Sequence, residues 1–214
     1  MIPKATFEHT NQPRSAFLAA AQAAFLELGY DRASMTEVSQ RVAGAPDVVW
    51  TVFTSKEEIF VEMVDAATQG LQALLLDLLK PGRDVRSTLT RFSAQFLGLL
   101  VVPERLALHR LICAEAKRFP RAAELFYSRG AQALHERVSE YLQACVAEGL
   151  LEDVSTLEMA QVLTRLALGD LHAQAMFLGM ATSIDDIHHQ AVLAADHFLR
   201  IFARPVSALD GETP

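Results

Sequence analysis

The 214-residue sequence has only two cysteines and no long hydrophobic run, and each scarcity excludes a class of protein. Cys113 and Cys145 provide neither a disulfide framework nor a metal-ligand spacing, which favours a reducing compartment. The most apolar run, FLGLLVVP, is much shorter than the ~20 residues needed to span a bilayer. The polar first residues contain no signal-peptide core. The sequence therefore predicts a cytoplasmic protein that makes no membrane contact.

Basic residues are also in short supply. The net charge is −7, and residues 1–63 contain five Lys or Arg against eight Asp or Glu. Nucleic-acid-binding proteins usually present a basic face to phosphates. Net charge bears on non-specific association rather than on fold, and a few well-placed cations can outweigh it. The acidity therefore lowers the expected affinity for DNA without excluding DNA binding.

Motifs for catalysis and for cofactors are missing as well. The sequence has no Ser nucleophile motif, no phosphate-binding glycine loop and no pair of Glu-x-x-His motifs. The acidic and histidine residues of segment 185–189 have a spacing that can hold a divalent ion on a helix. Acidic residues at a helix start also cap it and favour its dipole, which is the interpretation we prefer. The sequence predicts no enzyme, no metal site and no cofactor.

What the sequence does have is helical periodicity in every long segment. Five residues share one face of a first helix that Gly29 ends: Phe17, Ala21, Ala24, Phe25 and Leu28. Ser34 and Glu37 have capping-box spacing and open a second, short helix. Pro46 suits the first turn of a third helix. A second capping-box spacing opens a long fourth helix, with Ser55 and Glu58 as its two members.

Beyond the KPGR break at residues 80–83, the pattern predicts five further helices, at about 85–101, 103–119, 121–148, 156–179 and 184–203. The fold class is therefore all-α, with about nine helices. Three short N-terminal helices form a small domain that precedes a larger helical bundle. We expect residues 1–54 to form a helix-turn-helix DNA-binding domain, residues 55–204 a ligand-binding and dimerisation bundle, and residues 205–214 a polar tail.

The segment FLAAAQAAFLELGYDRASMTEVSQRVAGAPDVVWTVFTSKEEIF resembles the N-terminal domain of TetR/AcrR-type transcriptional regulators. The resemblance runs without gaps through GY at 29–30, SMTEV at 34–38 and FTSKE at 53–57. It implies that the second helix supports a third helix in the DNA major groove. It also implies phosphate contacts near helix N-termini. The predicted DNA-binding residues are Thr36, Arg41, Ala45, Pro46, Trp50, Thr51 and Lys56.

Three positions depart from the usual family pattern in the third helix. Ala45 replaces a capping Ser, Pro46 replaces a basic residue, and Asp47 replaces a small Gly. A carboxylate there repels phosphate, although it can accept a hydrogen bond from a cytosine amino group. Val48 and Val49 are expected to contact thymine methyl groups. The alternative interpretation is that Trp50 is buried against the first helix and needs no DNA.

A looser resemblance covers roughly residues 85–180, which are similar to the C-terminal domain of the AefR-like branch. It implies a ligand-sensing core and a homodimer through the last two helices. Two apolar stripes with small residues suit close helix packing, and the monomer core is the alternative role for both. The first is Ala160, Leu163, Ala167, Leu171, Ala175 and Leu178. The second is Ile187, Ala191, Ala194, Phe198 and Ile201.

A ligand pocket in this bundle is expected to be apolar with a few polar groups. His109 would supply a polar contact and the other residues would supply bulk. Ordinary core packing is the alternative role for each of them. The predicted ligand-binding residues are Phe92, Phe96, Leu100, His109, Cys113, Phe126 and Met176.

The sequence therefore predicts a ligand-responsive transcriptional regulator, a repressor released by a small apolar or amphipathic molecule. Its expected partners are a double-stranded DNA operator, the small-molecule effector and a second copy of the chain. The alternative is a ligand-binding or protein-interaction module whose helix-turn-helix no longer reads DNA. The placement of four cations around the third helix discriminates between the two: Lys4, Arg14, Arg41 and Lys56.

Overall fold

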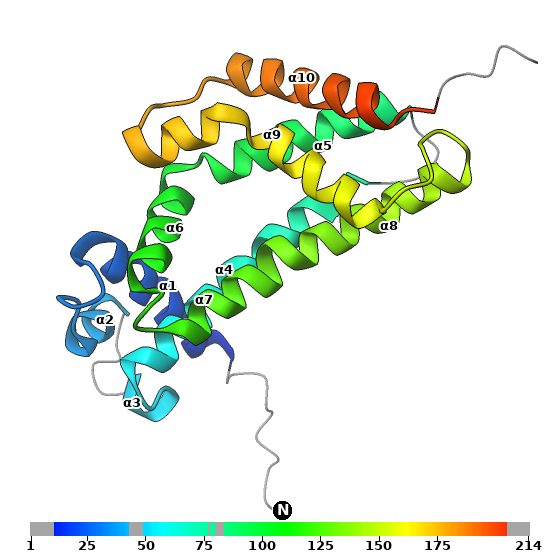
Figure 1. The fold of residues 1–214 in the computed structure, drawn as a ribbon. Coiled ribbons are helices and arrows are strands. Elements are labelled where there is room, and N and C mark those ends of the chain that lie inside the picture. The colour runs from blue at the N-terminus through cyan, green and yellow to red at the C-terminus, as the bar shows by residue number, and fades with distance from the viewer. Residues whose placement is uncertain (1–10, 43–48, 77, 80–83, 205–214) are drawn as a thin grey trace, which may run out of the picture. The chain divides into compact units, whose positions relative to one another are not determined.

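The computed structural model describes residues 11–42, 49–76, 78–79 and 84–204. Within these ranges every regular element is a helix (Figure 1), which confirms the all-α fold class. An isolated β-bridge joins Leu151 and Ala203. Among the described helices, none combines the length and the apolar character that crossing a bilayer requires.

The chain divides into two compact units, one of residues 1–70 with 103–130 and one of residues 71–102 with 131–214. Packing defines these units, whereas the expected division at residue 54 is a functional one and stays a prediction. The first unit contains the N-terminal helices together with two later ones. Its helices are α1 (Asn11–Leu28), α2 (Met35–Arg41), α3 (Val49–Val52), the first part of α4 (Lys56–Leu76), α6 (Pro103–Glu115) and α7 (Pro120–Phe126).

The core of the first unit forms where the apolar face of α1 meets α4 and the turn between α6 and α7. Phe17, Ala21, Ala24 and Phe25 are buried as the periodicity predicts. Four aromatic rings form a cluster in which Tyr30 and Phe60 each contact the other three, with centroids 4.6–5.9 Å apart: Phe25, Tyr30, Phe60 and Phe119. Each buried ring contributes about 1.5–3 kcal/mol by leaving water.

The helix caps differ in how well the sequence predicts them. At Ser34, both hydrogen bonds of the capping box are present, from Glu37 N to Ser34 Oγ at 3.1 Å and from Ser34 N to Glu37 Oε2 at 3.0 Å. At Ser55, only the bond from Glu58 N to Ser55 Oγ forms, at 3.1 Å. The Glu58 carboxylate instead accepts from Thr54 N and Thr54 Oγ1, at 2.7 and 2.6 Å.

Two of the helices expected after residue 101 have other bounds in the structure, and the second unit contains most of the helices that follow them. The helix expected at 103–119 ends at Glu115, and the one expected at 121–148 is divided by the π-helix η2 (Tyr127–Gln132), which crosses the boundary between the units. Helices α5 and α10 pack against each other and against α9, and α8 packs against α9. The unit's helices are α5 (Val85–Leu100), α8 (Ala133–Ala147), α9 (Thr156–Leu178) and α10 (Ile184–Phe202).

The two apolar stripes of α9 and α10 belong mainly to the core of this unit. Seven of their residues are buried within the single chain: Ala160, Leu163, Ala167, Ala175, Ala191, Ala194 and Phe198. Small residues let α9 and α10 approach each other and α5 closely, so the monomer-core interpretation is the right one for these positions. Leu178 and Ile201, at the stripe ends, are exposed.

Helix α9 changes direction at its middle (Figure 1). Gly169 has φ 50° and ψ −153°, a conformation that is essentially open only to glycine. A Cβ at this position would lie 2.5 Å from the Gln190 side chain of α10. Gln190 Nε2 donates to the carbonyl oxygen of Leu166 at 2.7 Å, in the turn before the kink. The bend in α9 is therefore matched to one side chain of α10.

Replacing Gly169 with Ala should lower the free energy of unfolding by about 2–4 kcal/mol, through backbone strain and the collision with Gln190. Gly98 in α5 is the matched control, because its nearest neighbour to an added Cβ is 3.9 Å away. Gly98→Ala should be neutral or stabilising by up to ~1 kcal/mol. Urea unfolding measures both variants. If the Gly169→Ala and Gly98→Ala proteins have equal free energies of unfolding, the kink tolerates a side chain.

Candidate DNA-binding site

Helix α3 has an inner and an outer side, although it contains only four described residues. Val49 is completely buried, and Phe53, one turn later, is buried beside it. Trp50 is 57% exposed, and Thr51 is exposed as well. The core interpretation of Trp50 is therefore wrong. The expected contact between Val49 and a thymine methyl group is also wrong, because Val49 anchors the helix to its own unit.

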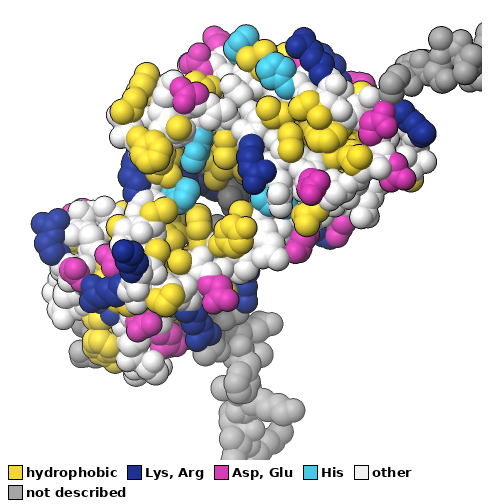
Figure 2. Space-filling model, in the orientation of Figure 1, with side chains coloured by type: hydrophobic (Ala, Val, Ile, Leu, Met, Phe, Trp, Pro, Cys, Tyr) yellow, Lys and Arg dark blue, Asp and Glu magenta, His cyan; other side chains and the backbone are white. Residues whose placement is uncertain are grey.

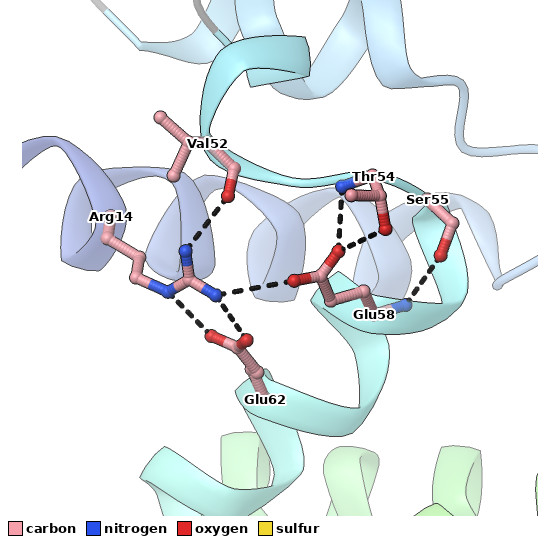
Figure 3. A network of polar contacts seen from close by, with 6 residues as sticks. All are labelled: Arg14, Val52, Thr54, Ser55, Glu58 and Glu62. Atoms are coloured by element: carbon pink, nitrogen blue, oxygen red, sulfur yellow. Dashed lines mark hydrogen bonds and ion pairs between the residues drawn. The ribbon is translucent and has the colours of Figure 1, made fainter.

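Arg14 of α1 connects α3 to α4 (Figure 3). Its Nη1 donates to the carbonyl oxygen of Val52, the last residue of α3, at 2.9 Å. Its Nε donates to Glu62 Oε2 of α4 at 2.8 Å, and its Nη2 donates to Glu62 Oε1. Glu58 lies 3.5 Å from the same Nη2. The guanidinium therefore satisfies a terminal helix carbonyl and a carboxylate at once.

The same guanidinium covers the ring of Phe53, with its carbon 4.5 Å from the ring centroid. Phe53 in turn meets Phe17 edge-on, with centroids 6.4 Å apart. The hydrogen bonds from Thr54 hold the pKa of Glu58 below its usual value, so the carboxylate stays charged beside Arg14. Arg14 thus belongs to the frame that places α3, rather than to the surface offered to DNA.

Two predicted DNA contacts lie on α2. Thr36 is exposed in its first turn. Arg41, in its last turn, forms a salt bridge with Glu27 of α1 at 2.7 Å. Exposed pairs of this kind contribute roughly 0–1 kcal/mol, so a phosphate can compete for Arg41 at little cost.

Lys56 begins α4 and lies on aromatic rings. Its Nζ is 4.3 Å from the ring centroid of Tyr30 and 5.8 Å from that of Phe25. The ammonium also donates to the carbonyl oxygen of Asp31 at 3.4 Å. Burial lowers the pKa of Lys56, while Asp31 opposes that effect. Ring and carbonyl together restrain a long side chain that is otherwise flexible.

Other predicted contacts lie outside the described residues. These are Ala45 and Pro46, and the same holds for Asp47, Val48 and Lys4. Within the described residues, the cations expected around α3 are Arg14, Arg41 and Lys56, and each has an intramolecular partner. Net charge alone gave no indication of these pairings.

The predicted ligand-binding residues fall into the two units. Phe92 and Phe96 are buried in the core of the second unit with stacked rings 5.8 Å apart, and Leu100 and Met176 are partly buried there. In the first unit, His109 lies against Phe126 at 5.3 Å, and Cys113 is exposed. That all seven line one ligand pocket stays a prediction.

The acidic start of α10 serves as a cap. Ser183 Oγ accepts from Asp186 N at 3.1 Å, and Asp186 Oδ2 accepts from Ser183 N at 3.2 Å, which completes a capping box. Across the part of the chain that the structure describes, no group of three or more His, Cys, Asp or Glu residues is arranged to hold a metal. The capping interpretation of this segment agrees with these contacts.

Comparison with known families identifies the C-terminal part of the chain. Residues 87–204, more than half of the sequence, match the family described as the AefR-like transcriptional repressor, C-terminal domain. The chain belongs to the AefR-like branch of TetR-family transcriptional regulators. It is therefore a regulator of transcription, from a family that is not enzymatic. No curated protein matches it significantly.

Solved structures of TetR-family regulators share the fold of this chain. A regulator from Mesorhizobium loti is 24% identical with a TM-score of 0.87, covering 92% of this chain and 99% of that one. The flavonoid-responsive regulator FrrA is 24% identical with a TM-score of 0.74, covering 92% and 100%. SmeT, the repressor of a multidrug efflux pump of Stenotrophomonas maltophilia, is 21% identical with a TM-score of 0.63, covering 99% and 96%.

Arg14→Ala in this TetR-family regulator should destabilise the first unit by about 1–2 kcal/mol, since charge-assisted hydrogen bonds are lost but partly exposed ones are screened. The amide of Phe53, which donates to Val49 at 2.9 Å, should exchange its hydrogen faster. Arg32→Ala is the control, because it removes the same charge together with one exposed hydrogen bond, to the Leu28 carbonyl oxygen, that does not involve α3. Urea unfolding and amide exchange give the readouts. If Arg14→Ala behaves like Arg32→Ala, then Arg14 does not hold α3.

Proposed function

We propose that this TetR-family regulator is a repressor that binds operator DNA as a homodimer and is released by a small apolar or amphipathic effector. The observation that carries the DNA-binding part is the exposure of Trp50, at 57%, on a helix whose other side is anchored by Val49 and Phe53. More than half of this large aromatic side chain is therefore available for contact with another molecule. Its indole N–H is a donor suited to a DNA phosphate.

The proposed interface combines exposed polar groups with a few cations. Thr36 and Thr51 contribute hydroxyl groups, while Arg41 and Lys56 contribute charge from the ends of α2 and α4. Ala45 and Pro46 complete the predicted set. Because so few phosphates are neutralised, we expect a shallow dependence of affinity on salt compared with strongly basic DNA-binding proteins.

The effector class rests on the relatives and on the predicted pocket residues. FrrA is described as flavonoid-responsive, and SmeT represses a multidrug efflux pump. The predicted pocket is mostly aromatic or aliphatic, with His109 as its polar group, which suits an apolar or amphipathic molecule. Such a molecule releases DNA only if its affinity differs between the two arrangements of the protein. It must bind more tightly to the arrangement that cannot engage DNA than to the arrangement that can.

The proposed dimer uses the outer faces of α9 and α10, not the buried stripes. Phe177 and Ile184, on either side of the turn between these helices, are 83% and 81% exposed in the single chain. Leu193 and Ile201 continue the exposed apolar surface along α10. Figure 2 shows hydrophobic and histidine side chains together on this surface. Exposed apolar patches of this kind mark interaction sites.

A symmetric dimer would present two recognition helices to successive major grooves, roughly 34 Å apart.

The alternative function is a ligand-binding or protein-interaction module with a silent helix-turn-helix. The pairing of Arg14 and Arg41 with glutamates favours it, because paired cations are less available to phosphate. The exposed Trp50 favours the repressor. A DNA titration decides between the two.

Trp50→Ala and Lys56→Ala should each weaken binding to a duplex from upstream of the protein's own gene by roughly 5- to 50-fold, and Lys56→Ala should also reduce the salt slope by about one per subunit. The control is Arg137→Ala, which removes one charge from an exposed residue of α8 that pairs only locally with Glu140. Fluorescence anisotropy at low and moderate salt measures all four proteins. Equal binding to a scrambled duplex would favour the silent module.

Leu193→Glu should convert the dimer to a monomer at micromolar concentration, because it places a charge in the centre of the proposed interface, where desolvation is costly. Val154→Glu is the control, since Val154 is exposed in the turn before α9. Sedimentation velocity distinguishes the two masses. A Leu193→Glu protein that remains dimeric would place the interface elsewhere.

A further inference from the structure

Asp31, in the turn between α1 and α2, lies between two cations of the first unit. Its backbone carbonyl accepts from Lys56 Nζ at 3.4 Å, and its carboxylate forms a salt bridge with Arg118. Arg118 comes from the turn between α6 and α7, 87 residues away in sequence. Asp31 of the helix-turn-helix region is therefore held by Lys56 of α4 and by Arg118 of the turn between α6 and α7.

The two cations also share an aromatic support. Lys56 Nζ lies 4.3 Å and the Arg118 guanidinium carbon 5.1 Å from the ring centroid of Tyr30. Arg118 also lies 5.2 Å from the ring of Phe119, which packs on Tyr30 at 4.6 Å. Both rings are buried, so they fix the places of the two cations. Glu115 lies 4.0 Å from Arg118, and Glu37 also raises the pKa of Lys56 through its charge.

We propose that Arg118 is a positioning residue for DNA binding: by pairing with the Asp31 carboxylate, it keeps that carboxylate from capturing the ammonium of Lys56. Lys56, seated on Tyr30, then has donors to offer a DNA phosphate. The inference rests on the proposed DNA-binding function and names a control of that same site. It assigns to the α6–α7 turn an influence on a phosphate contact that belongs to α4.

The charges around Lys56 support this competition. Among the nearby charged residues, Asp31 raises the pKa of Lys56 the most, and Arg118 lowers it the most. The backbone carbonyl of Asp31 lies 3.4 Å from the ammonium, so the carboxylate of the same residue is nearby, and its salt bridge with Arg118 offsets its charge. Without Arg118, Lys56 would be the remaining cation of this cluster, and the exposed Asp31 carboxylate would pair with it. It would compete with phosphate for the same donors.

The test measures DNA affinity of the full chain by fluorescence anisotropy, with labelled duplexes that cover the region upstream of its own gene. Arg118→Ala should weaken binding by about 3- to 10-fold and lower the salt slope by about one per subunit, as expected for a lost phosphate contact. Asp31→Asn in the Arg118→Ala background should restore affinity to about twofold of wild type, because the competing charge is gone. Arg118→Lys should stay near wild type.

A structural role for the salt bridge predicts the opposite pattern, since the double variant also lacks the bridge. Arg129→Ala removes a comparable bridge, to Asp65 in the same unit, and should leave affinity unchanged. The proposal is overturned if the double variant remains as weak as Arg118→Ala, or if Arg118→Ala still weakens binding in a Lys56→Ala background. Wild-type protein that binds none of the duplexes at low salt would overturn the proposed function, and this inference with it.

Discussion

A short helix gains little stability from its own hydrogen bonds, because the first turn costs more order than those bonds return, and the described part of α3 is Val49–Val52. Helix α3 therefore depends on what surrounds it, and the central contact is the guanidinium of Arg14. That group donates hydrogen bonds to the carbonyl oxygen of Val52 and to the carboxylate of Glu62 in α4. Val49 and Phe53 add apolar anchors on the same side. These contacts set the orientation of the exposed residues described in α3, including Trp50.

The acidity of the N-terminal segment follows from the same arrangement. Glu62, Glu27 and Asp31 are partners of Arg14, Arg41 and Arg118, and each pair joins different helices or turns. These pairs involve three of the eight carboxylates of residues 1–63, and one of them takes a cation from outside that segment. A charge sum over the segment treats paired and unpaired groups alike. That is why composition pointed to weak DNA binding without indicating which cations are available.

Local signals in the sequence predicted most of the fold. The buried face of α1 and the capping box at Ser34 depend on residues within a turn or two, so periodicity and spacing reveal them. The contacts of Arg14 span 38–48 residues and have no local signature. The kink at Gly169 was hidden because the apolar pattern of α9 continues through it. Val49 was misjudged because its direction on α3 depends on packing with distant helices.

The exposure of Trp50 has a spectroscopic consequence. It is the only tryptophan in the sequence, so indole fluorescence originates from α3 alone. Its emission begins from a water-exposed indole and changes when another molecule covers α3. Unfolding confined to the second unit leaves that emission nearly constant, whereas helical circular dichroism falls. The two optical signals therefore separate events at α3 from events in the rest of the chain without any label.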